Sequence, residues 1–245
     1  MMFVRLPGLP GTLARGAVRA GALAAALALA ACASPTSRFY TLGDVSAGAS
    51  AAAPAVRTAA AAPAWLIEVA PIDVPPQVAK TQLVVQSGHT QVKVLEQERW
   101  ASLPGDELRR ALSTSLTQQL NTIDVYGTAY SDATPVYRVS MNVQRFESWP
   151  GSHALIDAVW SVRAVRSTGV MTCRSVVSEP VGGGYDALVD GHRRALQRVS
   201  SQVVVAVRAM AASASAASAP QAGKGVARAT VPACPAEAAG AVAGG

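Results

Sequence analysis

The sequence has 245 residues, of which 50% are apolar but only 5% aromatic and 15% charged. The mean hydropathy of +0.26 therefore reflects alanine more than bulky core side chains, which indicates a compact part smaller than the chain. Arg5, Arg15 and Arg19 contribute three charges to the formal net charge of +6, so the rest of the chain carries +3 and lacks the dense basic stripe of a nucleic-acid-binding protein.

The N-terminal segment up to Ala31 has the features of an export signal. The chain up to Arg19 is basic and free of acids, and the segment from Ala20 to Ala31 is a short apolar run. Such a run is too short to cross a bilayer and is typical of a signal-peptide core. No later stretch has 18 uninterrupted apolar residues, so we expect an exported protein without a membrane-spanning helix.

The signal ends at a candidate lipidation site. Leu29-Ala30-Ala31-Cys32 resembles the bacterial lipobox, in which small residues precede an acylated cysteine. The alternative is an ordinary signal peptide that ends near a cysteine by chance. Acyl chains on Cys32 would anchor the protein firmly without crossing the membrane. Ala33 follows where an Asp would signal retention in the inner membrane, so we predict the periplasmic face of the outer membrane.

Composition divides the mature chain into three parts. Residues 32–64 comprise the lipidated N-terminus, a short apolar island at 38–42 and an Ala-rich stretch interpreted as a flexible tether. Residues 211–245 form a low-complexity tail rich in Ala, Ser, Gly and Pro. The folded domain is therefore predicted to be residues 65–210.

The first half of this domain is predicted to hold a strand, a hairpin and a helix. A strand at 65–69 is ended by prolines, and the β-branched runs at 82–86 and 91–95 flank a polar turn, which predicts a hairpin. Asp106 is the predicted N-cap of a helix that Asn121 ends. One face of this helix carries a leucine at every fourth position: Leu108, Leu112, Leu116 and Leu120.

The second half is predicted to hold three strands and a helix. Apolar and polar residues alternate at 137–144 and 156–164, and a run at 170–177 follows a turn, which favours an antiparallel meander. After a triple glycine, apolar residues at helical spacing over 188–210 predict the last helix. Two amphipathic helices need a sheet to cover, so we predict an α+β fold, a two-layer sandwich whose mainly antiparallel sheet is covered by both helices.

The sequence offers no constellation for catalysis or metal binding. His89 lies in a predicted turn, His153 in a predicted loop and His192 on the apolar side of the last helix, and none has a second ligand at the spacing of H-E-x-x-H. Asp157 has no evident carboxylate partner. The triple glycine lacks the Lys-Ser/Thr of a P-loop, and no G-x-S-x-G motif occurs. We therefore expect no enzymatic activity, no metal and no cofactor.

Trp100 and two cysteines leave alternatives open. Trp100 precedes the first helix, and it is either a structural residue at the core edge or an exposed contact for a partner. Cys173, in the third meander strand, and Cys234, in the tail, are an even pair in an oxidising compartment, which favours a disulfide. The alternative is a buried Cys173 with Cys234 free or paired between subunits.

Read in chain order, these pieces resemble one family. Behind the candidate lipobox come Arg38-Phe39-Tyr40-Thr41-Leu42, Arg99-Trp100-Ala101 and Arg145-Phe146-Glu147. Their order and spacing between Cys32 and Met210 resemble the ABC-type transport auxiliary lipoproteins of the PqiC type. The sequence departs from that family in its long alanine-rich tether and tail.

The resemblance implies a non-enzymatic outer-membrane subunit of an intermembrane phospholipid transport system that supports envelope integrity. Its implied partners are an MCE-domain membrane protein, indirectly an inner-membrane permease, phospholipid, and further copies of itself in a homo-oligomer. The alternative is a lipoprotein that acts alone in the periplasm, binding a small apolar ligand or assisting envelope assembly.

Overall fold

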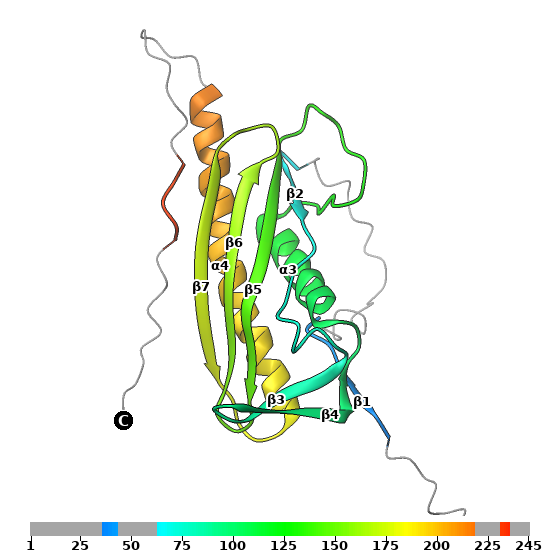
Figure 1. Ribbon diagram of the computed structural model, residues 1–245. Helices are drawn as coiled ribbons and strands as arrows, with labels where there is room; N and C mark the ends of the chain where they lie inside the picture. Colours follow the sequence, from blue (N-terminus) through cyan, green and yellow to red (C-terminus); the bar gives the residue numbers. More distant parts are fainter. Residues whose placement is uncertain (1–35, 44–62, 219–230, 236–245) are drawn as a thin grey trace, which may run out of the picture. The chain divides into compact units, whose positions relative to one another are not determined.

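The larger of two β-sheets forms the centre of the fold in this computed structural model, which describes residues 36–43, 63–218 and 231–235 (Figure 1). Its strands are β2 (Leu66–Val69), β5 (Val136–Trp149), β6 (His153–Ala164) and β7 (Val170–Pro180), in the order β2-β5-β6-β7. The last three form the antiparallel meander that the sequence predicts, whereas β2 joins its edge in parallel to β5.

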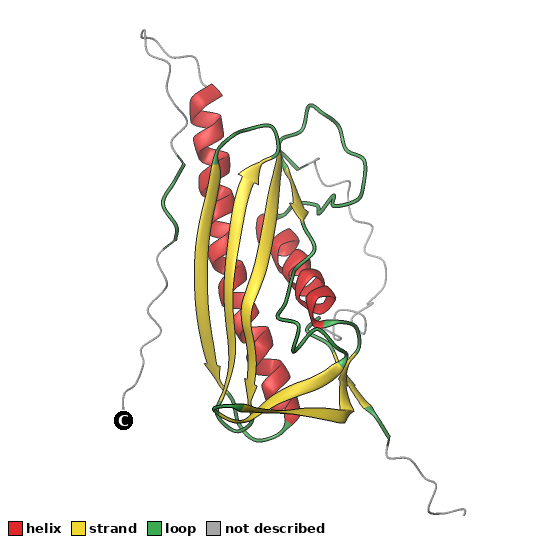
Figure 2. Ribbon diagram, in the orientation of Figure 1, coloured by secondary structure: helices red, strands yellow, loops and turns green. Residues whose placement is uncertain are grey.

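Both helices lie on one face of this sheet (Figure 2). Helix α4 (Tyr185–Ser218) packs along β6 and β7, and α3 (Pro104–Leu120) packs against α4 and β2. The period-2 pattern of the strands turns their apolar side chains toward these helices, and this side holds most of the core. Among the residues with no more than 1% exposure are Leu108, Leu112, Leu116, Val139, Ile156, Trp160, Leu188, Val199 and Val203.

A second, three-stranded sheet adds to the single sheet that the sequence predicts. It contains β1 (Arg38–Tyr40), β4 (Gln91–Trp100) and β3 (Gln82–Gly88) in the order β1-β4-β3. The predicted hairpin is β3 and β4, and β4 continues to Trp100, where it pairs in parallel with β1. The α+β fold class is therefore confirmed, with both parallel pairings at positions that local patterns do not reveal.

The start of α3 differs from its prediction, whereas its end agrees. Pro104 occupies the first helical turn and Leu103 is the N-cap, because a proline needs no N–H partner there and its φ already suits a helix. Asp106 is thus a residue of the first turn and not the N-cap, and its N–H donates to the Leu103 carbonyl at 2.9 Å. Asn121 ends the helix in the left-handed region, with φ of 49°.

The structure also moves two of the predicted boundaries. Helix α4 runs to Ser218, past the predicted end at Met210. The apolar island at 38–42 contains β1 and belongs to the domain. The other parts of the predicted tether and tail, residues 44–62, 219–230 and 236–245, lie outside the described residues.

Candidate functional site

The attachment of the N-terminal segment to the domain is the first functional feature. Cys32 and Ala33, the predicted lipidation and sorting residues, lie outside the described residues. Only the short segment 33–37 separates Cys32 from β1, whose residues Arg38–Tyr40 pair with β4. The predicted tether at 43–64 therefore links β1 to β2 within the domain, and it does not set the distance between anchor and domain.

A buried carboxylate holds this segment in place. Glu107, in the first turn of α3, is 1% exposed. Its Oε2 accepts hydrogen bonds from the Thr41 hydroxyl at 2.6 Å and the Leu42 N–H at 2.9 Å, and its Oε1 accepts one from the Ser102 hydroxyl. Burial alone raises the pKa of Glu107, but these donors and the nearby Arg110 hold its pKa below the usual value. The charged carboxylate thus binds Thr41 and Leu42, the residues that follow β1.

Helix α4 also binds this segment, through Arg193. The Arg193 guanidinium donates to the carbonyl oxygens of Thr41 at 2.7 Å and Gly43 at 3.1 Å. Tyr40 and Leu42 are both buried, at 8% and 4% exposure. The N-terminal segment is therefore fixed by pairing, by burial and by two charged side chains from different helices.

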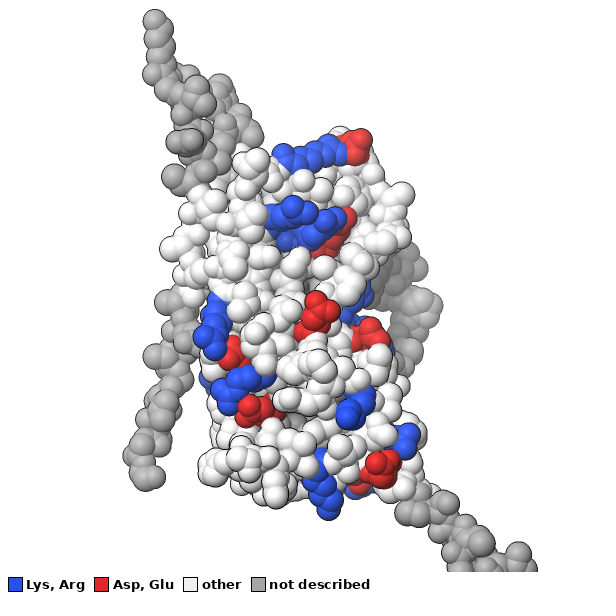
Figure 3. Space-filling model, viewed as in Figure 1, with Lys and Arg blue, Asp and Glu red and all other residues white. Residues whose placement is uncertain are grey.

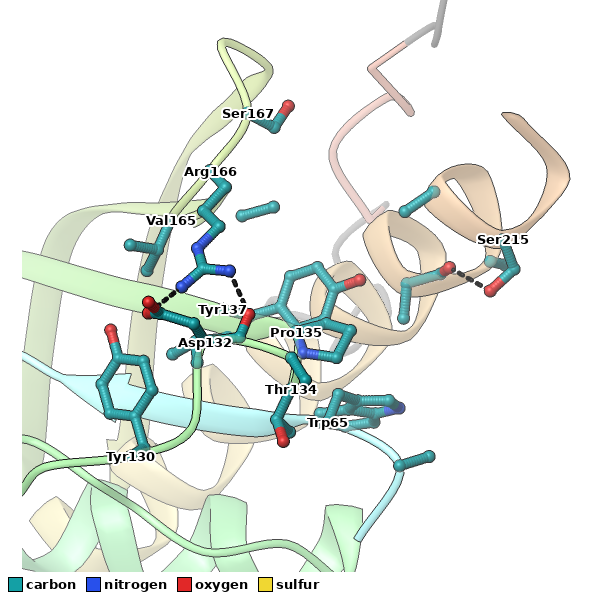
Figure 4. Close-up of a pocket in the computed structure, with 17 residues that line it drawn as sticks. Trp65, Tyr130, Asp132, Thr134, Pro135, Tyr137, Val165, Arg166, Ser167 and Ser215 are labelled. Carbon is teal, nitrogen blue, oxygen red and sulfur yellow. Dashed lines mark hydrogen bonds and ion pairs between the residues drawn. The ribbon is translucent and has the colours of Figure 1, made fainter. Parts of the chain in front are cut away.

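A cavity of about 810 Å³ lies where β2, β5, the turn after β6 and the last turns of α4 meet (Figure 4). Its aromatic wall is formed by Trp65 and Tyr137, whose rings pack edge to face at 5.7 Å. Pro135 and Val165 add apolar surface, and alanines and Ser215 of α4 line the remaining side. The shape and lining are suited to an apolar group, and nothing in the sequence pattern indicated this cavity.

One ion pair lies at the rim of the cavity. Arg166 contacts the carboxylate of Asp132, and both side chains are exposed (Figure 4). Because both charges are solvated, the pair provides a polar edge and contributes little to stability.

The two remaining cysteines are bonded to each other. Cys173 of β7 and Cys234 form a disulfide, with their Cα atoms 5.7 Å apart. Val231 lies close to Gly169, in the turn before β7. A Cβ atom at Gly169 would be only 3.4 Å from the Cγ2 atom of Val231. The disulfide thus holds residues 231–235 beside β7, an edge strand of the larger sheet.

Trp100 is not an exposed partner contact, because it is 2% exposed and packs in the core. It lies beside Phe146, with ring centroids 5.9 Å apart. Phe146 in turn stacks on His192 at 4.0 Å. The structural alternative for Trp100 is the one that its burial supports.

His192 is fully buried, as its place on the apolar side of the last helix predicts. Its Nε2 is 2.8 Å from the Ser148 hydroxyl, and its Nδ1 has no hydrogen-bond partner among the described residues. Burial lowers the pKa of His192 to about 3, so the ring is neutral at physiological pH. A neutral, enclosed imidazole packed on Phe146 is a core residue.

The other two histidines each contact Trp149. His153 begins β6 and is not in a loop, and it stacks on Trp149 at 5.6 Å. His89, in the turn between β3 and β4, contacts the same indole at 6.0 Å. Two histidines from distant parts of the sequence thus flank one tryptophan, a juxtaposition that no local motif indicated.

Asp157 has a basic partner on the neighbouring strand. It accepts hydrogen bonds from Arg174 at 2.9 and 2.7 Å, and these bonds, opposed by burial, hold the pKa of its carboxyl below the usual value. On the face seen in Figure 3, most acidic side chains likewise lie next to basic ones. The described residues include no group of three or more His, Cys, Asp or Glu side chains arranged to hold a metal.

Among the described residues, helix α4 is a candidate membrane span by length and composition alone. Residues Tyr185–Ala216 are long and apolar enough, by length and composition, to cross a membrane, with a mean hydropathy of 1.2. The sequence contains no uninterrupted apolar run there, because arginines and serines interrupt it. The apolar side of α4 packs on β6 and β7, as a core helix does.

Comparison with solved structures shows the same fold elsewhere. A crystal structure of an uncharacterized protein has a TM-score of 0.55 to this chain at 17% identity, covering 71% of this chain and 99% of the other. A crystal structure of a Xanthomonas campestris protein of the family DUF330 also matches, with a TM-score of 0.47 at 19% identity, covering 59% of this chain and 85% of the other. No curated protein matches the sequence.

A family model matches most of the chain. The matched residues, 49–204, include every strand of the larger sheet, the β3–β4 hairpin, α3 and the first part of α4. The family suggested by the order of the short motifs is the one that matches. The chain belongs to the family of ABC-type transport auxiliary lipoprotein components.

Proposed function

We propose that this protein is an outer-membrane lipoprotein subunit of an MCE-type intermembrane phospholipid transport system, which supports envelope integrity. Its direct partner is an MCE-domain membrane protein, and it acts indirectly with an inner-membrane permease. The observation that carries the proposal is a transport auxiliary domain, matched over residues 49–204, that follows a lipobox ending at Cys32.

The proposed role is binding and assembly without catalysis. Two buried carboxylates support this role, because each one binds a neighbouring part of the fold: Glu107 binds the N-terminal segment, and Asp157 binds Arg174. The buried His192 is enclosed by the core. In the proposed assembly, several copies surround the end of the MCE-domain protein and anchor it to the outer membrane.

Anchoring is tested by replacing Cys32, the proposed acceptor of the lipid. Cys32→Ser removes the thiol that accepts diacylglycerol, so the variant is expected to lose globomycin-sensitive processing and to leave the membrane fraction. Ala33→Asp is the matched change that keeps the thiol and is expected to move the protein to the inner membrane. Unchanged outer-membrane fractionation of both variants would contradict the proposed anchor and its sorting.

The partnership is tested by affinity purification from the native host after gentle crosslinking. An MCE-domain protein in stoichiometric yield with the wild type, and its loss with Cys32→Ser, is the expected result. Recovery of this chain without any MCE-domain protein, while it remains in the outer membrane, would contradict the transport assignment and leave the anchoring intact.

The cavity next to Trp65 favours a second candidate, a lipoprotein that binds a small apolar ligand on its own. Its volume of about 810 Å³ is large enough for a drug-sized or acyl ligand. Native mass spectrometry of the purified domain would detect such a ligand as a discrete added mass. Ala212→Trp, which places a bulky side chain in the lining, should abolish the added mass, whereas His89→Gln, far along the strands, should not.

A further inference from the structure

Aromatic and histidine side chains gather at one end of the domain. Trp149 ends β5, and its partly exposed indole lies between His153, at the start of β6, and His89, in the β3–β4 turn. The Trp149 Nε1–H donates to Glu147 at 3.0 Å. This arrangement presents an aromatic ring with polar neighbours at the surface, the combination that membrane interfaces favour.

The chain toward Cys32 leaves the domain at this same end. Arg38, the first residue of β1, lies 3.9 Å from Asp186 in the first turn of α4, whereas Arg193, two turns further along α4, binds Thr41. Strand β1 therefore begins beside the first turn of α4 and runs inward from there. Figure 1 shows this end of the domain, with β1, the β3–β4 hairpin and the turn between β5 and β6.

A hydrogen bond connects the Trp149 turn to the same region. The Val181 N–H, just before α4, donates to the carbonyl of Ser152 in the β5–β6 turn at 2.9 Å. The entry of β1 and the Trp149 cluster are thus both placed beside the first turn of α4. The salt bridge between Arg38 and Asp186 and the hydrogen bond between Val181 and Ser152 therefore place β1 and the Trp149 turn at the same end of the domain.

The short link limits how far this end can lie from an anchor at Cys32. Six residue steps separate Cys32 from Arg38, which fully extended span about 20 Å. Phe39, the next residue, is 67% exposed, so its ring offers apolar surface to whatever lies beside β1. A bilayer that holds the acyl chains is therefore within reach of Phe39 and of the surface around it.

We propose that this end of the domain, which carries Phe39, Trp149, His89 and His153, rests against the surface of the phospholipid bilayer. The proposal relies on acylation of Cys32, which is part of the proposed function. It orients the domain: Trp65, which packs on Tyr137 near the start of β5, faces away from the membrane. Twelve residue steps along β5, from 137 to 149, place the two tryptophans about 40 Å apart.

Such an orientation gives the two ends of the domain separate tasks. Phe39 and Trp149 contact lipid, and the opposite end, with the cavity beside Trp65, is presented to the periplasm. Trp100 and Trp160 are 2% and 1% exposed, so they form a constant background in any tryptophan measurement. The two remaining tryptophans therefore report on opposite ends of the molecule.

The test is quenching of tryptophan fluorescence by lipid-borne nitroxide. Full-length acylated protein is reconstituted in vesicles of phosphatidylethanolamine and phosphatidylglycerol, with and without lipids that carry the nitroxide on the headgroup. Trp149→Phe is expected to lose most of the quenching that the wild type shows, and the matched variant Trp65→Phe to keep it. Adding Phe39→Trp to Trp149→Phe, at an exposed position, is expected to restore quenching.

Three results count against the proposal, and they differ in how much of it they overturn. Quenching that survives Trp149→Phe and disappears with Trp65→Phe would show the opposite orientation, and the proposed function would stand. Protein that does not float with vesicles and has an unmodified Cys32 by mass spectrometry would overturn the anchor and the orientation together. Failure of Phe39→Trp to restore quenching in a floating, folded protein would remove Phe39 from the contact.

Discussion

The buried His192 makes the stability of this domain depend on pH between about pH 5 and pH 7.5, above the range in which most carboxyl groups titrate. His192 is enclosed by Phe146 and Ser148, and burial lowers its pKa from 6.5 to about 3. In the unfolded chain the ring recovers its ordinary pKa, so between pH 6.5 and pH 3 the unfolded state binds more protons than the folded state. The free energy of unfolding must therefore fall as the pH falls below 6.5.

The size of this effect follows from the two pKa values. At pH 5 the unfolded histidine is mostly protonated while the folded one is neutral, which costs about 2 kcal/mol of stability relative to pH 7.5. Between those two pH values the buried carboxylates Glu107 and Asp157, whose pKa values are lowered, stay ionised in the folded state. The histidine contribution can therefore be measured with little interference from acid titration.

Urea unfolding of the soluble domain at pH 5 and at pH 7.5, followed by circular dichroism, measures the difference. The wild type is expected to lose about 2 kcal/mol at pH 5. His192→Gln, which keeps a polar side chain near Ser148 but does not titrate, should show less stability at pH 7.5 and a much smaller pH difference. His89→Gln, an exposed histidine, should leave the difference unchanged. An equal pH difference in the wild type and His192→Gln would refute the reasoning.

Three further changes test the contacts that hold the domain together. Glu107→Gln removes the charge that binds Thr41 and Leu42, and the free energy of unfolding in urea is expected to fall by about 1–3 kcal/mol. An unchanged urea midpoint would mean that this charge does not stabilise the N-terminal segment. Cys234→Ser opens the disulfide to Cys173, so proteolysis near the tail should speed up while the core stays folded; equal cleavage rates with and without reductant in the wild type would contradict this. Trp100→Ala should cost about 3–5 kcal/mol because the ring is buried, and a melting temperature equal to the wild type would argue for a surface position.

The N-terminal strand of the domain is stabilised by contacts that only the folded chain brings together. Tyr40 pairs with Trp100, and Leu42 meets Glu107, although the two members of each pair are far apart in the sequence. The sequence around each of these residues does not indicate which distant residue it contacts. The consequence for function is that residues 43–64, which follow β1 in the chain, add nothing to the distance between the domain and its predicted anchor at Cys32.

Local sequence patterns determined the elements that repeat along the chain. Alternation of apolar and polar side chains predicted β5, β6 and β7, and leucines at every fourth position predicted α3, because burial of one face imposes the period of the backbone on the sequence. The burial of His192 followed from the same periodicity. The lipobox-like motif at Cys32 consists only of local residues, so it too could be predicted from the sequence.

The tertiary structure decided everything that depends on residues distant in sequence. The parallel pairing of β1 with β4, the cavity beside Trp65 and the placement of His89 next to Trp149 all arise where separate elements meet. A short strand such as β1 has too few residues to show a period, and a cavity is a shape that no single segment encodes. The sequence alone thus determined which segments become strands and helices, and only their packing decided which of these elements lie together at each end of the domain.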